Sequence, residues 1–159
     1  MFGCIMKNEH ICRGVLERIL RMKIGKIEYP TLQKSISPFY ESKGIRLDVY
    51  TADESHVFDI EIQTSIPPDL GKRTRYYQSM MDVDLLVAGA DYDELNKTII
   101  IFICPFDPFG EGRYMYTFEN ICLEKHEENA IFSNLIDYGM VRIRKSEEKV
   151  PEKLMKFYI

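Results

Sequence analysis

Long apolar runs are missing from this sequence, since none approaches the roughly 20 residues of a membrane-spanning helix. Its N-terminal segment also lacks the longer apolar stretch and the small-residue cleavage site of a signal peptide. Internal repeats, low-complexity tracts and linkers rich in Pro, Gly or Ser are absent as well. We therefore expect a cytoplasmic protein with no membrane partner, folded as one domain over residues 1–159, and a C-terminal extension beyond this range stays open.

A surplus of positive charge is absent too, because the formal net charge is −4. That value excludes a globally basic nucleic-acid protein, although a few well-placed cations still suffice to bind phosphate. Cysteine is scarce, and none of the four cysteines has the two-residue spacing of a zinc knuckle or a redox dithiol. The three histidines do not cluster with them, so we expect buried, reduced thiols.

The residues that are present are typical of a globular domain. Hydrophobic residues make up 45% of the 159 residues and charged residues 29%, which excludes a disordered chain. A domain of this length buries about 68–70% of its unfolded surface, so it needs no disulfide bonds to fold.

Two segments have the hydrophobic periodicity of amphipathic helices. The first runs from about residue 8 to residue 23, with Asn8 as its N-cap and Gly25 at its C-terminus. The second runs from about residue 70 to residue 87, after a Pro-Pro-Asp turn, with Gly89 as its stop signal. Residues 151–159 are also predicted to be helical.

Other segments have the patterns of β-strands. Alternating apolar and polar residues predict strands over residues 45–52 and 57–64, joined by a polar turn of hairpin length. Residues 26–37 allow a short strand that Pro30 interrupts, which favours an edge position. The continuous apolar run at residues 98–104 predicts a strand covered on both faces, and residues 114–123 allow one or two more strands.

The predicted hairpin gathers acidic side chains on one face. In the simplest register Ala52 lies opposite Val57, which places Asp48 opposite Glu61. One face is then polar and the other belongs to a core. The polar set is Arg46, Asp48, Tyr50, Asp59, Glu61 and Gln63, and the apolar set is Leu47, Val49, Phe58, Ile60 and Ile62.

Opposed carboxylates at Asp48 and Glu61 repel each other, and Asp59 adds to the repulsion. A divalent cation removes this penalty, and oxygen ligands suit Mg²⁺ or Mn²⁺. Such a cation activates water and stabilises the charge that builds on a phosphoryl group. The alternative is a solvated polar sheet face, on which Arg46 pairs with Asp48 and Glu61 across the strands.

Five segments, in chain order, resemble one known family. They are residues 45–49, 58–63, 72–79, 101–110 and 116–119. Together they resemble the PD-(D/E)XK nuclease family transposases, also called Rpn-type recombination-promoting nucleases. The resemblance covers most of the chain, from about residue 8 to residue 139.

This resemblance implies an α/β fold with a restriction-endonuclease-like core, in which a central mixed sheet is flanked by helices. It implies that Asp48 and Glu61 are catalytic acids that bind Mg²⁺ or Mn²⁺, with the main-chain carbonyl of Ile62 as a further ligand. Gln63 stands where the superfamily at large has a lysine, although it fits this family's Glu-x-Gln pattern. A neutral glutamine positions the attacking water by hydrogen bonding alone, which puts the rate in doubt.

The resemblance also points to two groups outside the hairpin. Some nucleases of the superfamily use an acid of the first helix, for which Glu9 is the candidate, with capping or a solvated charge as the alternative. Between residues 70 and 81 the second predicted helix carries cations and no acid. The residues expected to contact DNA phosphates are Lys72, Arg73, Arg75 and Tyr76. The alternative is a solvated helix whose Arg75 pairs with the sheet carboxylates.

We therefore expect a Mg²⁺-dependent deoxyribonuclease that hydrolyses DNA phosphodiester bonds and acts in DNA recombination. DNA is the expected partner, and a homodimer stays open. The alternative is a catalytically weak or inactive module with a nuclease fold that binds DNA or regulates another protein. A purely structural interaction domain is a second alternative.

Overall fold

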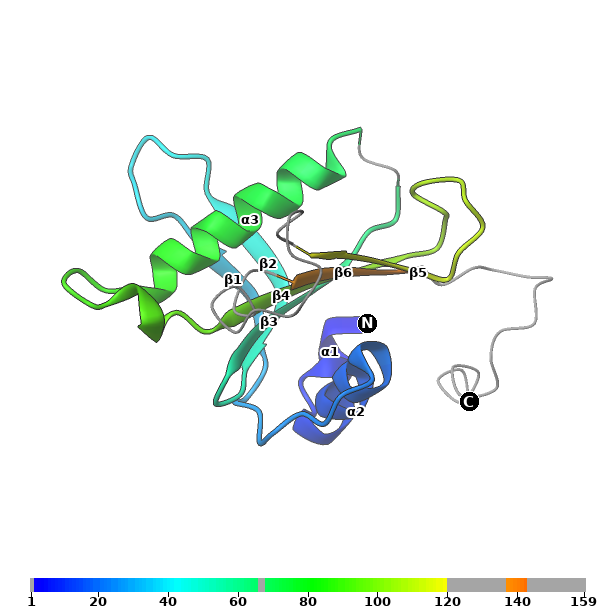
Figure 1. Ribbon diagram of the computed structural model, residues 1–159, viewed down its shortest axis with the longest axis horizontal. Helices are drawn as coiled ribbons and strands as arrows, with labels where there is room; N and C mark the ends of the chain where they lie inside the picture. Colours follow the sequence, from blue (N-terminus) through cyan, green and yellow to red (C-terminus); the bar gives the residue numbers. More distant parts are fainter. Residues whose placement is uncertain (1, 66–67, 120–136, 143–159) are drawn as a thin grey trace, which may run out of the picture.

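A central mixed sheet with helices on both faces organises the computed structural model of the chain (Figure 1). The structure describes residues 2–65, 68–119 and 137–142. Its elements, in chain order, are α1 (Phe2–Met6), α2 (Glu9–Leu20), β1 (Thr31–Ile36), β2 (Ile45–Ala52), β3 (His56–Ile62), α3 (Leu70–Leu85), the 3₁₀ turn η1 (Tyr92–Glu94), β4 (Lys97–Cys104), β5 (Met115–Glu119) and β6 (Asp137–Arg142). This is the predicted α/β class, and it is consistent with a restriction-endonuclease-like core.

The strands of the sheet lie in the order β1-β2-β3-β4-β6-β5. The first three form an antiparallel meander, and β4 lies parallel to β3 with α3 in the crossover between them. β6 continues parallel to β4, and β5 pairs with β6 in the antiparallel direction. The predicted edge strand is β1, which begins directly after Pro30 because proline has no N–H to give to a ladder.

Each face of the sheet has its own hydrophobic core. Helices α1 and α2 cover one face and α3 covers the other (Figure 1). Under α2, Leu16 packs in one cluster with Phe58 and Ile101, while Met81 of α3 shares the second cluster with Phe102. Strand β4 supplies side chains to both clusters, so the predicted strand covered on both faces is confirmed.

Helix α2 begins at the predicted N-cap. The Asn8 side chain accepts hydrogen bonds from the main-chain N–H groups of His10 at 3.0 Å and Ile11 at 3.2 Å. The helix ends at Leu20, before Gly25, because Arg21 takes the left-handed conformation with φ 56°. The prediction that Gly25 ends the helix is therefore wrong.

Three of the four cysteines lie in the part of the chain that the structure describes. Cys12 and Cys104 are buried and free as predicted, but Cys4 is exposed, so its predicted burial is wrong. Cys122 and residues 151–159 lie outside the described residues. Among the residues that the structure describes, no helix is both long enough and apolar enough to cross a membrane.

Candidate active site

The β2–β3 hairpin has the predicted register. Ala52 pairs with Val57, and the ladder ends at the pair of Val49 and Ile60. Asp48 and Glu61 follow directly beyond that last pair, one on each strand. The hairpin therefore brings the two predicted acids side by side at the point where regular pairing stops.

The alternation of side chains along β2 breaks at Asp48. Val49 packs in the core under α2, whereas Leu47 packs in the core under α3. Residues two apart on a regular strand share a face, so the backbone is irregular here. The residue of β1 that lies between the partners of Leu47 and Val49 is Gln33, which has a positive φ of 53°. The predicted common core face of Leu47 and Val49 is therefore wrong.

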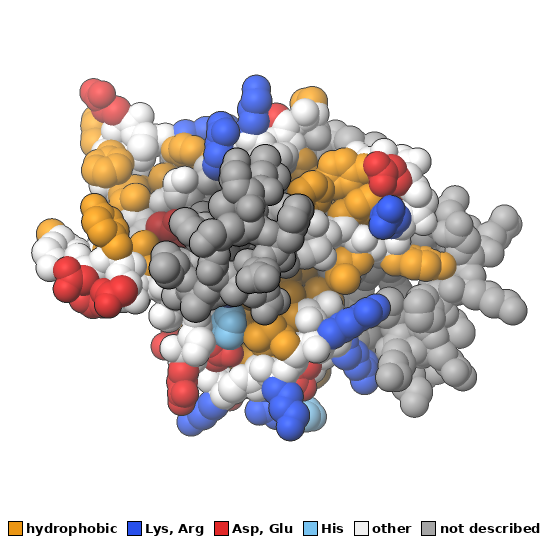
Figure 2. All heavy atoms as spheres, viewed as in Figure 1, with side chains coloured by type: hydrophobic (Ala, Val, Ile, Leu, Met, Phe, Trp, Pro, Cys, Tyr) orange, Lys and Arg blue, Asp and Glu red, His pale blue; other side chains and the backbone are white. Residues whose placement is uncertain are grey.

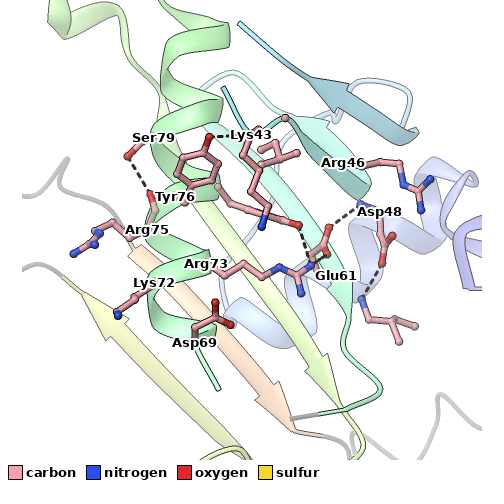
Figure 3. Close-up of a pocket in the computed structure, with 14 residues that line it drawn as sticks. Lys43, Arg46, Asp48, Glu61, Asp69, Lys72, Arg73, Arg75, Tyr76 and Ser79 are labelled. Atoms are coloured by element: carbon pink, nitrogen blue, oxygen red, sulfur yellow. Dashed lines mark hydrogen bonds and ion pairs between the residues drawn. The ribbon is translucent and has the colours of Figure 1, made fainter. Parts of the chain in front are cut away.

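Each acid is held by the main chain of the opposite strand. The main-chain N–H of Asp48 donates to Glu61 Oε1 at 2.8 Å, and the main-chain N–H of Ile62 donates to Asp48 Oδ2 at 3.3 Å (Figure 3). A main-chain N–H that leaves water needs a hydrogen-bond acceptor. Beyond the last paired residues of the hairpin, the carboxylates of Glu61 and Asp48 are the acceptors for these two N–H groups. The two carboxylates thus take defined orientations at one end of the hairpin.

The acidic face of the hairpin is covered rather than solvated. Asp59 is 0% exposed and Glu61 is 3% exposed, so the alternative of a solvated polar sheet face is wrong. Arg46, which that alternative paired with these acids, is exposed. Charged groups that leave water lose several kcal/mol of hydration each unless partners replace it. The buried acids therefore need protons or cations.

Asp59 meets this need by binding a proton. Burial raises the pKa of Asp59 well above 3.8, and the charges of Glu61 and Asp48 raise it further. No donor among the described residues reaches either carboxylate oxygen of Asp59. A protonated Asp59 has a donor of its own, and Glu61 accepts from it. We therefore assign the neutral form to Asp59. Burial also raises the pKa of Glu61, against the hydrogen bond from the Asp48 main chain.

Asp59→Asn is expected to raise the free energy of unfolding at pH 8 by about 1–3 kcal/mol, because the folded state must keep a proton on Asp59 at that pH and asparagine needs none. An acid whose pKa is higher in the folded state destabilises that state as the pH rises from 3.8 through the raised pKa. The amide donates permanently to Glu61, so the gain should be smaller at pH 5 than at pH 8. Urea unfolding at both pH values measures it, with exposed Asp93→Asn as the control. An equal effect at both pH values would contradict a neutral Asp59.

Arg73 of α3 makes three hydrogen bonds to this end of the hairpin and to its own helix. Its guanidinium donates to Glu61 Oε2 at 3.1 Å, to Gln63 Oε1 at 2.8 Å and to the Tyr77 hydroxyl at 2.9 Å. The other end of the Gln63 amide donates to the Ser65 carbonyl at 2.7 Å. Arg73 is therefore the helix residue that pairs with a sheet carboxylate, where the sequence alternative named Arg75.

A cavity of about 920 Å³ opens between this end of the hairpin and α3. Its lining includes two of the hairpin acids, Asp48 and Glu61, together with Ile62. The cations that line it are Lys43, Arg46, Lys72, Arg73 and Arg75. Figure 2 shows Lys and Arg side chains along the upper edge of the molecule, where Figure 1 places α3. The cavity thus combines an acidic corner with basic walls.

The residues expected to contact phosphate lie in different situations. Lys72 and Arg75 are exposed, and in Figure 3 they extend from α3 away from Glu61, whereas Arg73 extends toward it. The Tyr76 hydroxyl donates to the main-chain carbonyl of Lys43 at 2.7 Å, so it fixes the β1–β2 loop. Lys72 and Arg75 are therefore the residues best placed to bind phosphate.

Other predicted residues lie off the cavity, and some lining residues were not predicted. Glu9 is exposed at the first position of α2, on the opposite sheet face from α3, and it does not line the cavity. Gln63 is not among the lining residues either. Sequence reasoning missed Lys43 as a lining residue, and it gave Arg46 a role only in the alternative in which Arg46 pairs with the sheet carboxylates. Both cations lie shortly before Asp48 in the sequence, Lys43 just ahead of β2 and Arg46 within it, and this position is the signal that could have found them.

The donor set fits a hard divalent ion that keeps water ligands. No group of three or more His, Cys, Asp or Glu side chains able to hold a metal occurs in residues 2–65, 68–119 and 137–142. Asp48 and Glu61 are two carboxylates on one cavity wall, and Mg²⁺ is commonly bound by one or two carboxylates while it retains several waters. The charge of Asp48 also raises the pKa of Glu61, so added positive charge is favoured there.

The chain matches the model of a known protein family. A family model described as PD-(D/E)XK nuclease family transposase matches residues 1–157. No curated protein and no solved structure gives a significant match. The matched range includes the whole hairpin, α3 and every residue that lines the cavity.

Proposed function

The chain belongs to the PD-(D/E)XK nuclease family transposases, and we propose that it is a DNA endonuclease that depends on Mg²⁺ or Mn²⁺. Membership supports a nuclease-type function, and nucleases of this class generally use divalent metals. The DNA substrate and the dependence on metal are our inference from the cavity. Within the family, we propose the recombination-promoting Rpn type.

The observation that carries this proposal is the pairing of Asp48 and Glu61 on a cavity with basic walls. A phosphodiester substrate is an anion, so it needs cations along its backbone and a Lewis acid at the bond that breaks. Lys72 and Arg75 supply exposed cations on α3, and the two carboxylates supply hard oxygen ligands a short way along the same cavity. Cations for the phosphates and oxygen ligands for a metal ion therefore lie on one cavity, which supports the proposal.

We assign the metal ligands to Asp48 and Glu61, with the main-chain carbonyl of Ile62. When bound, a divalent ion lowers the pKa of a coordinated water and polarises the scissile phosphate. The main-chain N–H groups of Asp48 and Ile62 orient the two carboxylates, and the hydrogen bond from the Asp48 N–H favours the ionised form of Glu61. Lys72 and Arg75 bind flanking phosphates, with Arg46 on the other wall. Gln63 accepts from Arg73 and donates to the Ser65 carbonyl. Each end of its amide keeps one further hydrogen-bonding position, and we propose that it uses this capacity to position the attacking water.

A plasmid-nicking assay tests the proposal. Supercoiled DNA should be nicked with Mg²⁺ or Mn²⁺ and should stay intact with EDTA, because the carboxylates alone provide no Lewis acid. Binding of the same DNA, measured by anisotropy in parallel, separates the alternatives. Binding without nicking in either metal would assign the inactive DNA-binding module, and neither binding nor nicking would assign a structural interaction domain.

A further inference from the structure

The acidic corner of the cavity has a cation of its own in Arg73. Among the described residues, Arg73 is the cation paired with an acid of this corner, and its side chain is 29% exposed. The guanidinium carbon also lies 4.8 Å from the centroid of the Tyr77 ring and 5.7 Å from that of Phe102. Two aromatic rings and three hydrogen bonds hold it from several directions. Such a group is oriented before any ligand arrives.

We propose that Arg73 is a positioning residue, which sets the orientation of Glu61 and Gln63 and supplies the positive charge that the Glu-x-Gln motif lacks. Its planar fork reaches Glu61, Gln63 and the Tyr77 hydroxyl at once. A lysine ammonium is compact and carries no such fork, so it does not span the same three partners. The role in catalysis rests on the proposed nuclease function, whereas the clamp on Gln63 and Glu61 does not.

The geometry separates Arg73 from the two cations that flank it. Lys72 and Arg75 are exposed and extend away from Glu61, so they are available to an anion outside the protein (Figure 3). Arg73 turns inward, and three of its five N–H donors bond to partners within the chain. Arg73 therefore acts on the carboxylate end of the site and not on the DNA backbone.

The position of the Arg73 charge predicts that its removal strengthens the binding of a divalent ion while it weakens catalysis. A guanidinium that bonds Glu61 Oε2 repels a divalent ion at the same carboxylate. Arg73→Gln should therefore bind Mn²⁺ roughly 10-fold more tightly than the wild type. Its nicking kcat should nevertheless fall by about 10- to 100-fold, as when a hydrogen-bond partner of a metal ligand is lost. Arg73→Lys keeps the charge, so its Mn²⁺ affinity should stay near wild type while kcat still falls.

The matched control is Arg75→Gln on the same helix. It should leave Mn²⁺ affinity unchanged and reduce the slope of log DNA affinity against log salt by about one unit. Arg73→Gln should leave that salt slope unchanged. Calorimetry with Mn²⁺ and anisotropy with a DNA duplex measure the two quantities. A lower salt slope for Arg73→Gln with unchanged kcat would make Arg73 a phosphate contact and overturn the proposal, as would unchanged Mn²⁺ affinity together with unchanged kcat.

A measurement without metal or DNA separates this proposal from the nuclease proposal. The side-chain amide resonances of Gln63 should shift toward those of a solvated glutamine in Arg73→Gln and should not shift in Arg75→Gln. If the Gln63 resonances shift in this way but the wild type neither binds Mn²⁺ nor nicks DNA, only the nuclease function is refuted. The proposal that Arg73 holds Gln63 and Glu61 would then stand. Unchanged Gln63 resonances in Arg73→Gln would overturn the clamp, whatever the wild type does.

Discussion

Asp48→Asn is expected to abolish divalent-dependent nicking while the fold is kept. The asparagine oxygen still accepts from the main-chain N–H of Ile62, a hydrogen bond that alanine would lose. The loss of one charged ligand should lower nicking by more than about 100-fold, which is the upper end of the effect when only a partner of a metal ligand is removed. Plasmid nicking in Mn²⁺ measures this loss.

The stability of Asp48→Asn distinguishes a catalytic acid from a structural one. Asp48 is among the charges that raise the pKa of Asp59 and of Glu61, so its removal relieves repulsion. The free energy of unfolding without metal should therefore stay the same or rise. Glu54→Gln, in the exposed turn at the other end of the hairpin, is the control and should nick like the wild type. A variant that unfolds would instead make Asp48 a structural partner.

Lys72→Ala combined with Arg75→Ala is expected to weaken DNA binding in a way that depends on salt. Each phosphate contact releases counterions from DNA, so losing both should flatten the log–log salt dependence by roughly two units. The pair should still bind Mn²⁺ like the wild type, because neither side chain bonds a described carboxylate. Anisotropy titrations between low and moderate salt measure the slope.

The matched control for this pair is Lys23→Ala with Lys26→Ala. These lysines are exposed and follow α2, which lies on the sheet face opposite α3. Their removal changes the net charge by the same amount, so it corrects for long-range attraction. If both double variants changed the salt slope equally, Lys72 and Arg75 would not be DNA contacts, and their effect would be one of net charge alone.

The register of the β2–β3 hairpin and the position of its acids could be predicted from local sequence patterns. Side chains alternate along a strand and the turn length limits the register, so the pairing of Ala52 with Val57 could be predicted. The position of Asp48 beside Glu61 followed from that register. The buried strand β4 was equally visible, because an apolar run of that length has no polar face to expose.

What local rules missed depends on how elements pack. The short helix α1 spans Phe2–Met6, and a helix that short has too few turns for a periodic pattern. The irregularity of β2 at Asp48 breaks the alternation on which the face assignment was based. The rotation of α3 about its axis is a tertiary property, and it decides that Arg73 and not Arg75 meets Glu61.

The most direct test of the central claim is a calorimetric titration of Mn²⁺ into the wild type and into Asp48→Asn, without DNA. The two carboxylates on the cavity wall predict saturable binding in the wild type and its loss in the variant. Absence of saturable binding in the wild type, or equal binding in both proteins, would contradict a metal site at Asp48 and Glu61.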